Sequence, residues 1–132
     1  MEYSFGPLLL SLELTDEGTL NAVHLPKDPP TDLDQKHLQA ALQFLAKHSV
    51  APAKSQGESA FRVALTQIPS GQTRTYGQLA KLLATSPRAV GRWCASNRLL
   101  LRIPCHRVVA TSGLSGFRAG VEWKRLLLRL EQ

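Results

Sequence analysis

The sequence is poor in cysteine, in long apolar runs and, beyond its midpoint, in acids. Its two cysteines, Cys94 and Cys105, cannot complete a tetrahedral zinc site alone, and neither lies in a CxxC pair or near histidines at metal-ligand spacing. No apolar run approaches the roughly 20 residues of a membrane helix. Met1-Glu2 places an acid where a secretory signal carries positive charge. We therefore expect no metal, no organic cofactor and no membrane span, in a cytoplasmic protein that is nucleoid-associated if prokaryotic.

Charge divides the chain into two unlike parts. Residues 1–59 hold four lysines against eight acids, whereas residues 60–132 hold twelve Lys and Arg, ten of them Arg, against two acids. An arginine-rich region attracts polyanions, and guanidinium groups suit bidentate contacts with phosphate and guanine. Nucleic acid is therefore the expected partner, with a generic basic surface as the alternative. The 132 residues, 43% of them hydrophobic, are enough to bury a core.

Residues 1–57 are expected to form a small scaffold unit, a β-hairpin followed by one helix. Apolar segments at 7–12 and 20–25 flank an Asp-Glu-Gly turn signal and indicate two strands. Thr31, with Asp34 three residues later, is expected to cap the helix. The apolar face of that helix is expected to contain Leu33, Leu38, Ala41, Leu42 and Leu45.

Residues 58–132 are expected to form a mostly helical domain with a helix-turn-helix, so the fold class is α/β of the α+β kind. Apolar spacing indicates a helix over 61–68. Thr75 and Gln78 form a capping box for a helix of about nine residues. Ser86-Pro87 is an N-cap with proline at the first helical position, and it starts the next helix after a short turn. That spacing is typical of a helix-turn-helix.

The second helix of this pair carries arginines and small residues on one face. At positions i, i+3, i+4 and i+7 stand Arg88, Gly91, Arg92 and Ala95. Small side chains let a helix backbone approach a groove, and arginines reach phosphates or bases on either side. This face predicts DNA binding, and the alternative is a helix pair with a solvated basic surface.

The segment Pro104-Cys105-His106-Arg107 contains the candidate nucleophile. Proline favours extended backbone at Ile103, so Cys105 is expected on an active-site strand. The cationic neighbours His106 and Arg107 are expected to lower the pKa of the thiol and populate the thiolate. Because adjacent strand residues point to opposite faces, a Cys105–His106 hydrogen bond needs a bend or a bridging water. A cysteine hydrolase using this pair is one alternative, and a helix-turn-helix module with a structural cysteine is another.

Several ordered motifs in residues 59–132 match one family. Its active-site signature is similar to Ile103-Pro104-Cys105-His106-Arg107-Val108-Val109. Its DNA-binding helices and hinge are similar to Ile68-Pro69-x-Gly71-x-Thr73-x-Thr75-Tyr76-Gly77-x-Leu79-Ala80, Arg88-Ala89-Val90-Gly91 and Asn97. Its substrate loop and last helix are similar to Gly113, Gly116-Phe117-x-x-Gly120 and Leu127-Leu128-x-x-Glu131. Together these motifs resemble the O6-alkylguanine-DNA alkyltransferases, while the N-terminal unit resembles them only loosely.

The resemblance implies direct reversal of DNA damage, once per protein molecule. Cys105 would take the alkyl group, such as methyl, from O6 of guanine, or O4 of thymine, in a base flipped out of double-stranded DNA. His106 would draw the thiol proton through a water, and Glu131 would orient His106. Tyr76 would donate a hydrogen bond to the flipped guanine, and Asn97 would hold the hinge before the active-site strand.

The same resemblance implies the residues that bind DNA and the base. Arg88 would enter the duplex where the flipped nucleotide left. Further DNA contacts are expected from Thr75, Ala89, Gly91, Arg92, Ala95 and Arg107. The walls of the base pocket are expected to be Val108, Ser112, Gly113, Phe117, Ala119 and Gly120. We expect a monomer, and the nearest alternative is a related sensor that binds alkylated DNA without transfer.

Four features depart from the family pattern. The loop from Gly113 to Gly116 is one residue shorter than in many members. The other departures are Trp93, Arg98 and Arg102, at positions where a small residue, a proline and an apolar residue are usual. All four bear on the size of the pocket, and so on which alkyl groups fit.

Overall fold

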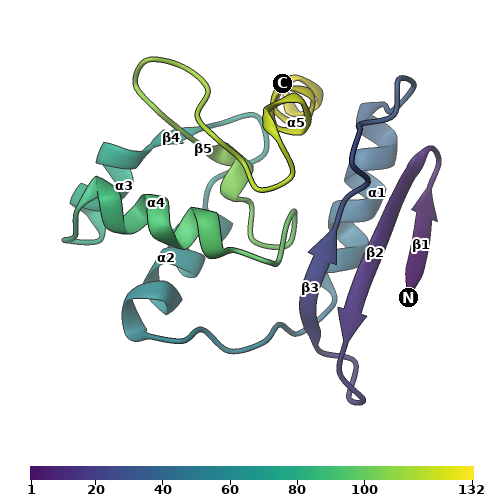
Figure 1. Ribbon diagram of the computed structural model, residues 1–132, viewed down its shortest axis with the longest axis horizontal. Helices are drawn as coiled ribbons and strands as arrows, with labels where there is room; N and C mark the ends of the chain where they lie inside the picture. Colours follow the sequence, from purple (N-terminus) through teal and green to yellow (C-terminus); the bar gives the residue numbers. More distant parts are fainter.

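The computed structural model describes residues 1–132 and places a three-stranded sheet at one end of the molecule and three helices at the other (Figure 1). Strands β1 (Glu2–Phe5), β2 (Leu8–Leu14) and β3 (Leu20–His24) are antiparallel and lie in that order. The predicted hairpin is confirmed as β2 and β3. Strand β1 is additional, and its edge position leaves alternate residues exposed, which made its apolar signal too weak to find.

Helix α1 (Gln35–Ala46) packs beside the sheet and contacts both β1 and the last helix, α5 (Val121–Glu131) (Figure 1). The predicted Thr31 cap is wrong, because Asp34 is itself the N-cap and accepts a hydrogen bond from the His37 amide. Leu33 is therefore outside the helix, although its side chain is buried. The buried face of α1 consists of Leu38, Ala41 and Leu45.

The two helices of the predicted helix-turn-helix begin where the sequence signals predict, whereas the helix expected over 61–68 begins earlier, at Gln56. Helix α2 (Gln56–Thr66) is capped by Ser55, and α3 (Tyr76–Leu82) begins with the complete Thr75–Gln78 capping box. Ser86 caps α4 (Pro87–Ser96), with proline in its first turn. Only four residues separate α3 from α4, and the two helices contact each other, as expected for a helix-turn-helix.

The segment around Cys105 differs from the predicted strand. Residues Cys105–Arg107 form a 3₁₀ turn, η1, and only Val108–Val109 continue as strand β5, parallel to β4 (Arg74–Thr75). Pro104 has no amide hydrogen to give to a ladder, and the chain turns there, with the Cys105 amide donating to the Ile103 carbonyl and the Arg107 amide donating to Pro104. The active-site strand is therefore a turn that leads into a strand.

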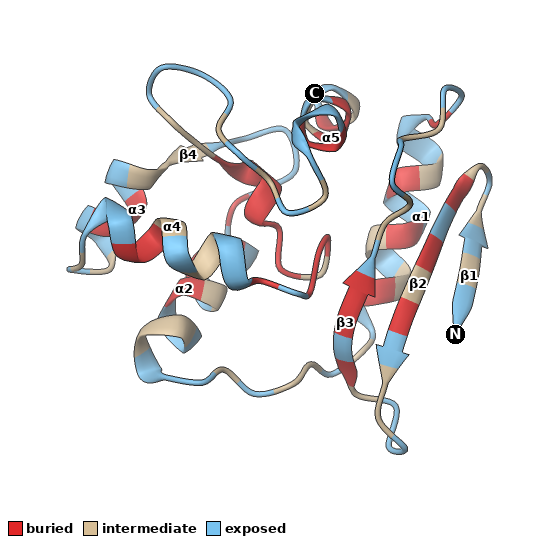
Figure 2. Cartoon of the chain, in the orientation of Figure 1, coloured by how far each residue is buried: buried red, intermediate tan, exposed pale blue.

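One hydrophobic cluster of 25 buried residues runs through the sheet, α1 and the C-terminal helices, with buried faces turned toward the interior (Figure 2). The Val23 amide of β3 donates to the Arg98 carbonyl, and Val23 pairs with Leu99 in a parallel bridge. The sheet thus supports the segment between α4 and η1. The boundary near Gly57 stays a prediction, since the core is continuous across it. None of the helices has the length and apolar character to cross a membrane.

Candidate active site

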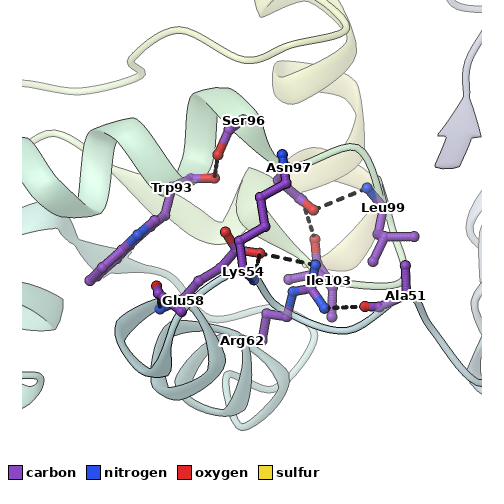
Figure 3. A network of polar contacts seen from close by, with 10 residues as sticks. Ala51, Lys54, Glu58, Arg62, Trp93, Ser96, Asn97, Leu99 and Ile103 are labelled. Atoms are coloured by element: carbon purple, nitrogen blue, oxygen red, sulfur yellow. Dashed lines mark hydrogen bonds and ion pairs between the residues drawn. The ribbon is translucent and has the colours of Figure 1, made fainter. Parts of the chain in front are cut away.

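Cys105 is held at its thiol by the end of α4. Asn97 follows the last residue of α4, and its amide Nδ2 donates to Cys105 Sγ over 3.1 Å and to the Ile103 carbonyl over 3.0 Å. Asn97 Oδ1 accepts from the Leu99 amide over 3.0 Å (Figure 3). One side chain therefore joins α4, the following loop and the thiol, which is the hinge position that the resemblance implied.

The Cys105 thiol is protonated at rest, contrary to the sequence-based expectation of a thiolate. Burial raises the pKa of Cys105, and the Asn97 hydrogen bond and the charges of Lys124 and Arg118 oppose this only in part. The expectation failed because it counted His106 and Arg107 as cations facing the sulfur. Both side chains instead bind Glu131.

Glu131, near the end of α5, is the centre of a buried polar cluster. Its Oε1 lies 3.0 Å from His106 Nε2 and accepts from Arg107 Nε over 2.9 Å. Burial acts to raise the pKa of Glu131, but the hydrogen bonds and charges of His106 and Arg107 outweigh it and lower that pKa to about 2. Glu131 is therefore an anion whose partners are both buried.

His106 is a neutral imidazole with one nitrogen free. Burial lowers the pKa of His106, against the opposing effect of Glu131. Because an ionised carboxylate only accepts, Nε2 must carry the hydrogen that it donates to Glu131, which leaves Nδ1 as an acceptor. Nδ1 is buried and has no hydrogen-bond partner in the protein. This nitrogen can accept a proton.

Two residues predicted to bind DNA are inside the protein. Arg107 is buried, and its guanidinium is used by Glu131 and by the Ile68 carbonyl, 2.8 Å away. The side chain of Ala89 is buried in the core-facing side of α4. Because both side chains are buried, neither can reach a duplex. The prediction for Arg107 was wrong because local spacing could not reveal its partner, 24 residues away.

The other predicted DNA-binding residues lie toward the surface. Arg88, Arg92 and Ala95 are exposed on α4, and Gly91 is half-buried between them. Thr75 is half-buried, and its hydroxyl accepts from the Gln78 amide as the cap of α3. The basic face of α4 is therefore open to solvent, as predicted.

A cavity of about 300 Å³ has Cys105 in its lining. Its lining comes from α3, α4, η1 and the loop before α5, and consists of Tyr76, Gly91, Cys94, Ala95, Cys105, Gly116, Phe117 and Arg118. This volume is at the lower end of the range for ligand pockets. Gly91 and Ala95 belong both to the lining and to the basic face of α4, so the cavity opens on the predicted DNA-binding side.

Only one of the predicted pocket walls lines this cavity, namely Phe117. Val108 is fully buried behind it, and Ser112, Gly113 and Gly120 are exposed along the loop. Ala119 lines a separate cavity beside Arg98. The loop turns residues 116–118 toward the thiol, and that turn could not be read from the spacing of its glycines.

Lys124 and Ser115 belong to the site but were not predicted from the sequence. Lys124 is fully buried in α5, and its Nζ donates to the Val108 carbonyl over 2.7 Å and to Ser115 Oγ over 2.9 Å. Ser115 Oγ is also 2.7 Å from the Tyr76 hydroxyl. One available signal was that Lys124 shares a face of α5 with Leu127 and Glu131, at i, i+3 and i+7.

Cys94 is a second thiol in the cavity, but an unreactive one. Burial raises the pKa of Cys94 to about 12. Cys94 therefore packs as a small apolar residue of α4. No group of three or more His, Cys, Asp and Glu side chains is arranged to hold a metal ion.

Fold and site together define a helix-turn-helix protein with a buried Cys–Asn–His–Glu cluster under its basic helix. Residues 58–132 match the family model "6-O-methylguanine DNA methyltransferase, DNA binding domain", and the chain belongs to that family.

Among curated relatives, a Methylated-DNA--protein-cysteine methyltransferase of Saccharolobus islandicus is 54% identical over 65 residues, which are 49% of this chain and 43% of the relative. The chain thus covers under half of that relative's length.

Solved structures of the family resemble the whole chain. The Mycobacterium tuberculosis OGT in complex with DNA has a TM-score of 0.72 at 25% identity, over 99% of this chain and 90% of that one. The O6-methylguanine-DNA methyltransferase from Pyrococcus kodakaraensis has a TM-score of 0.69 at 25% identity, over 99% of this chain and 96% of that one. The predicted α+β fold class is confirmed by these likenesses.

Proposed function

We propose that the protein repairs alkylated double-stranded DNA by moving an alkyl group, such as methyl, from O6 of guanine to its own Cys105. O4 of thymine is a second substrate of the same chemistry. The observation that carries the proposal is Cys105 in the lining of a cavity of about 300 Å³, followed in the chain by a neutral His106 whose Nδ1 has no partner. Family membership and the DNA complex of a similar structure support it.

The transfer is a displacement at carbon. The Cys105 proton passes to His106 Nδ1 through a water, and Glu131 stabilises the imidazolium that forms. A sulfur–carbon bond then forms as the carbon–O6 bond breaks, and the electron pair stays on guanine, which takes up a proton. Tyr76 donates a hydrogen bond to the departing base. Because the product is an alkyl thioether, whose dealkylation would have to expel the thiolate, a poor leaving group, each molecule acts once.

The basic face of α4 brings the lesion to the cavity. Arg92 contacts phosphate, and Arg88 fills the gap left by the flipped nucleotide. Gly91 and Ala95 let the helix backbone approach the groove, and they also line the cavity. The partner is therefore duplex DNA carrying the lesion, bound by a monomer, and the place of action is chromosomal DNA in the cytoplasm or nucleoid.

The alternatives account for fewer of these features. A sensor that binds alkylated DNA without transfer has no need of an acceptor thiol beside a general base, and Cys105 is present here. A plain helix-turn-helix module has no need of the cavity. A cysteine hydrolase would turn over repeatedly on its substrate.

The test is the intact mass of the protein after mixing with a short duplex that contains one O6-methylguanine. We expect a gain of one methyl group, located on Cys105 by peptide mapping. The Cys105→Ala variant should bind the same duplex without any gain in mass. Tight binding of the lesion duplex without methylation of the wild type would support the sensor instead. Methylation of Cys94 would show that Cys94, and not Cys105, is the acceptor.

A further inference from the structure

The proposed mechanism leaves unexplained why a lysine is fully buried next to the cavity. Lys124 Nζ has three acceptors around it, namely the Val108 carbonyl at 2.7 Å, Ser115 Oγ at 2.9 Å and the Gly116 carbonyl at 3.3 Å. No carboxylate pairs with Lys124. Burial lowers the pKa of Lys124, whereas the three acceptors match the three hydrogens of an ammonium group, which can only donate.

This donation leaves the Ser115 hydroxyl hydrogen unused and so allows Ser115 to donate in the next hydrogen bond. Ser115 Oγ accepts from Lys124, which leaves the Ser115 hydrogen available for the Tyr76 hydroxyl oxygen, 2.7 Å away. If Ser115 donates to Tyr76, the Tyr76 hydrogen is free to point into the cavity that both Tyr76 and Cys105 line. If Tyr76 instead donates to Ser115, its hydroxyl hydrogen is not available to a base in the cavity.

We propose that Ser115 is a positioning residue that carries polarisation from buried Lys124 to Tyr76 and so directs the Tyr76 hydroxyl hydrogen toward the base in the cavity. The inference rests on the proposed function. In such a chain each hydrogen bond strengthens the next, because a donor that itself accepts becomes a better donor. The charge that develops on guanine as the alkyl group leaves is then stabilised by Tyr76, with Lys124 as the distant source of positive charge.

The surroundings of Tyr76 agree with this role. Burial raises the pKa of Tyr76, and the Ser115 hydrogen bond opposes that rise. Ser115 lies on the loop before α5, and Tyr76 is the first residue of α3, 39 positions earlier. The same three donations of Lys124 also fix the loop position, so a purely structural role for Ser115 must be tested separately.

The experiment is a double-mutant cycle on the single-turnover rate of methyl transfer from duplex O6-methylguanine. We expect Ser115→Ala to slow transfer about tenfold, the effect of losing one hydrogen bond in the transition state. Tyr76→Phe should slow it about a hundredfold. The variant with both changes should be no slower than Tyr76→Phe alone, because Ser115 acts only through the Tyr76 hydroxyl.

Two controls separate this role from support of the loop. Ser115→Thr keeps a hydroxyl and should retain most of the rate. Thr111 lies on the same loop, and its exposed hydroxyl makes no hydrogen bond. Thr111→Ala should therefore transfer methyl at the wild-type rate. Binding of the lesion duplex should be equal in all the Ser115 variants.

The outcomes are distinct. Two results would overturn the inference and leave the proposed function intact. In one, the rate losses of the two single variants multiply in the double variant. In the other, the wild type transfers methyl and Ser115→Ala transfers it at the same rate. A wild type that transfers nothing would overturn both.

Discussion

The two regions of the molecule differ in what they bury. The sheet and α1 bury apolar side chains such as Leu8, Leu10 and Leu38, whereas all five buried polar or charged residues lie between Asn97 and Glu131. Burying a charge is costly unless it is paired and hydrogen-bonded, so a buried polar cluster indicates a role beyond stability. The scaffold role of the N-terminal region stays a prediction, and the C-terminal region holds all of the buried polar groups.

The largest difference in stability is expected between variants that remove two different carboxylates, Glu131 and Glu13. Glu131→Ala should lower the free energy of unfolding by about 3–5 kcal/mol, because it leaves Arg107 buried without its partner. The matched change Glu13→Ala removes an exposed acid that pairs with His24 and Arg98, and should leave stability unchanged. Urea unfolding of both variants measures this, and equal stability losses would contradict the contrast.

A core substitution in the scaffold should separate stability from chemistry. Leu10→Ala removes a fully buried side chain of β2 and should cost about 2–5 kcal/mol of unfolding free energy. The methyl-transfer rate of the molecules that remain folded should be unchanged. Measurements of both at a temperature well below unfolding test this, and a rate loss would mean that the scaffold shapes the cavity directly.

Acid should act first on the C-terminal region. The pKa of Glu131 is lowered from 4.5 to about 2 by His106 and Arg107, despite burial. An acid with a lowered folded pKa stabilises the fold above its unfolded pKa, and that contribution is lost as pH falls from about 4.5 toward 2. Stability measured over this range should fall more steeply for the wild type than for Glu131→Gln. Parallel curves would show that Glu131 is not the titrating group.

The smallest effects should come from single surface cations. Arg92→Ala should weaken duplex binding about fivefold and reduce the salt slope of affinity by about one. Lys36→Ala removes an exposed cation of α1, in the scaffold, and should change neither quantity. Fluorescence anisotropy at several salt concentrations measures the duplex affinity of both variants. An equal loss of affinity in Lys36→Ala would indicate that DNA contacts both regions.

The same division explains what the sequence could predict. Caps and turns are local, so Thr75, Gln78, Ser86 and Pro87 correctly indicated where α3 and α4 begin. Resemblance to a family also pointed to Asn97 and Glu131, and the structure places Asn97 against Cys105 and Glu131 against His106.

Errors arose where distant contacts decide the outcome. Arg107 was predicted to bind DNA because the sequence does not show that Glu131 of α5 binds it. The turn at Cys105 follows from Pro104 together with the packing around it. The proton state of Cys105 depends on burial, which no local pattern reports. Ser115 and Lys124 belong to no local motif, since their contacts join the loop, α5 and α3.

The most direct test of the central claim is the stoichiometry of repair with lesion in excess. O6-methylguanine in a short duplex is counted over time against a known amount of protein, together with the free Cys105 thiol. We predict that guanine is restored until one lesion has been repaired for each protein molecule, with equal loss of the thiol. Repair that continues beyond one equivalent, or none at all while the thiol stays free, would contradict the account.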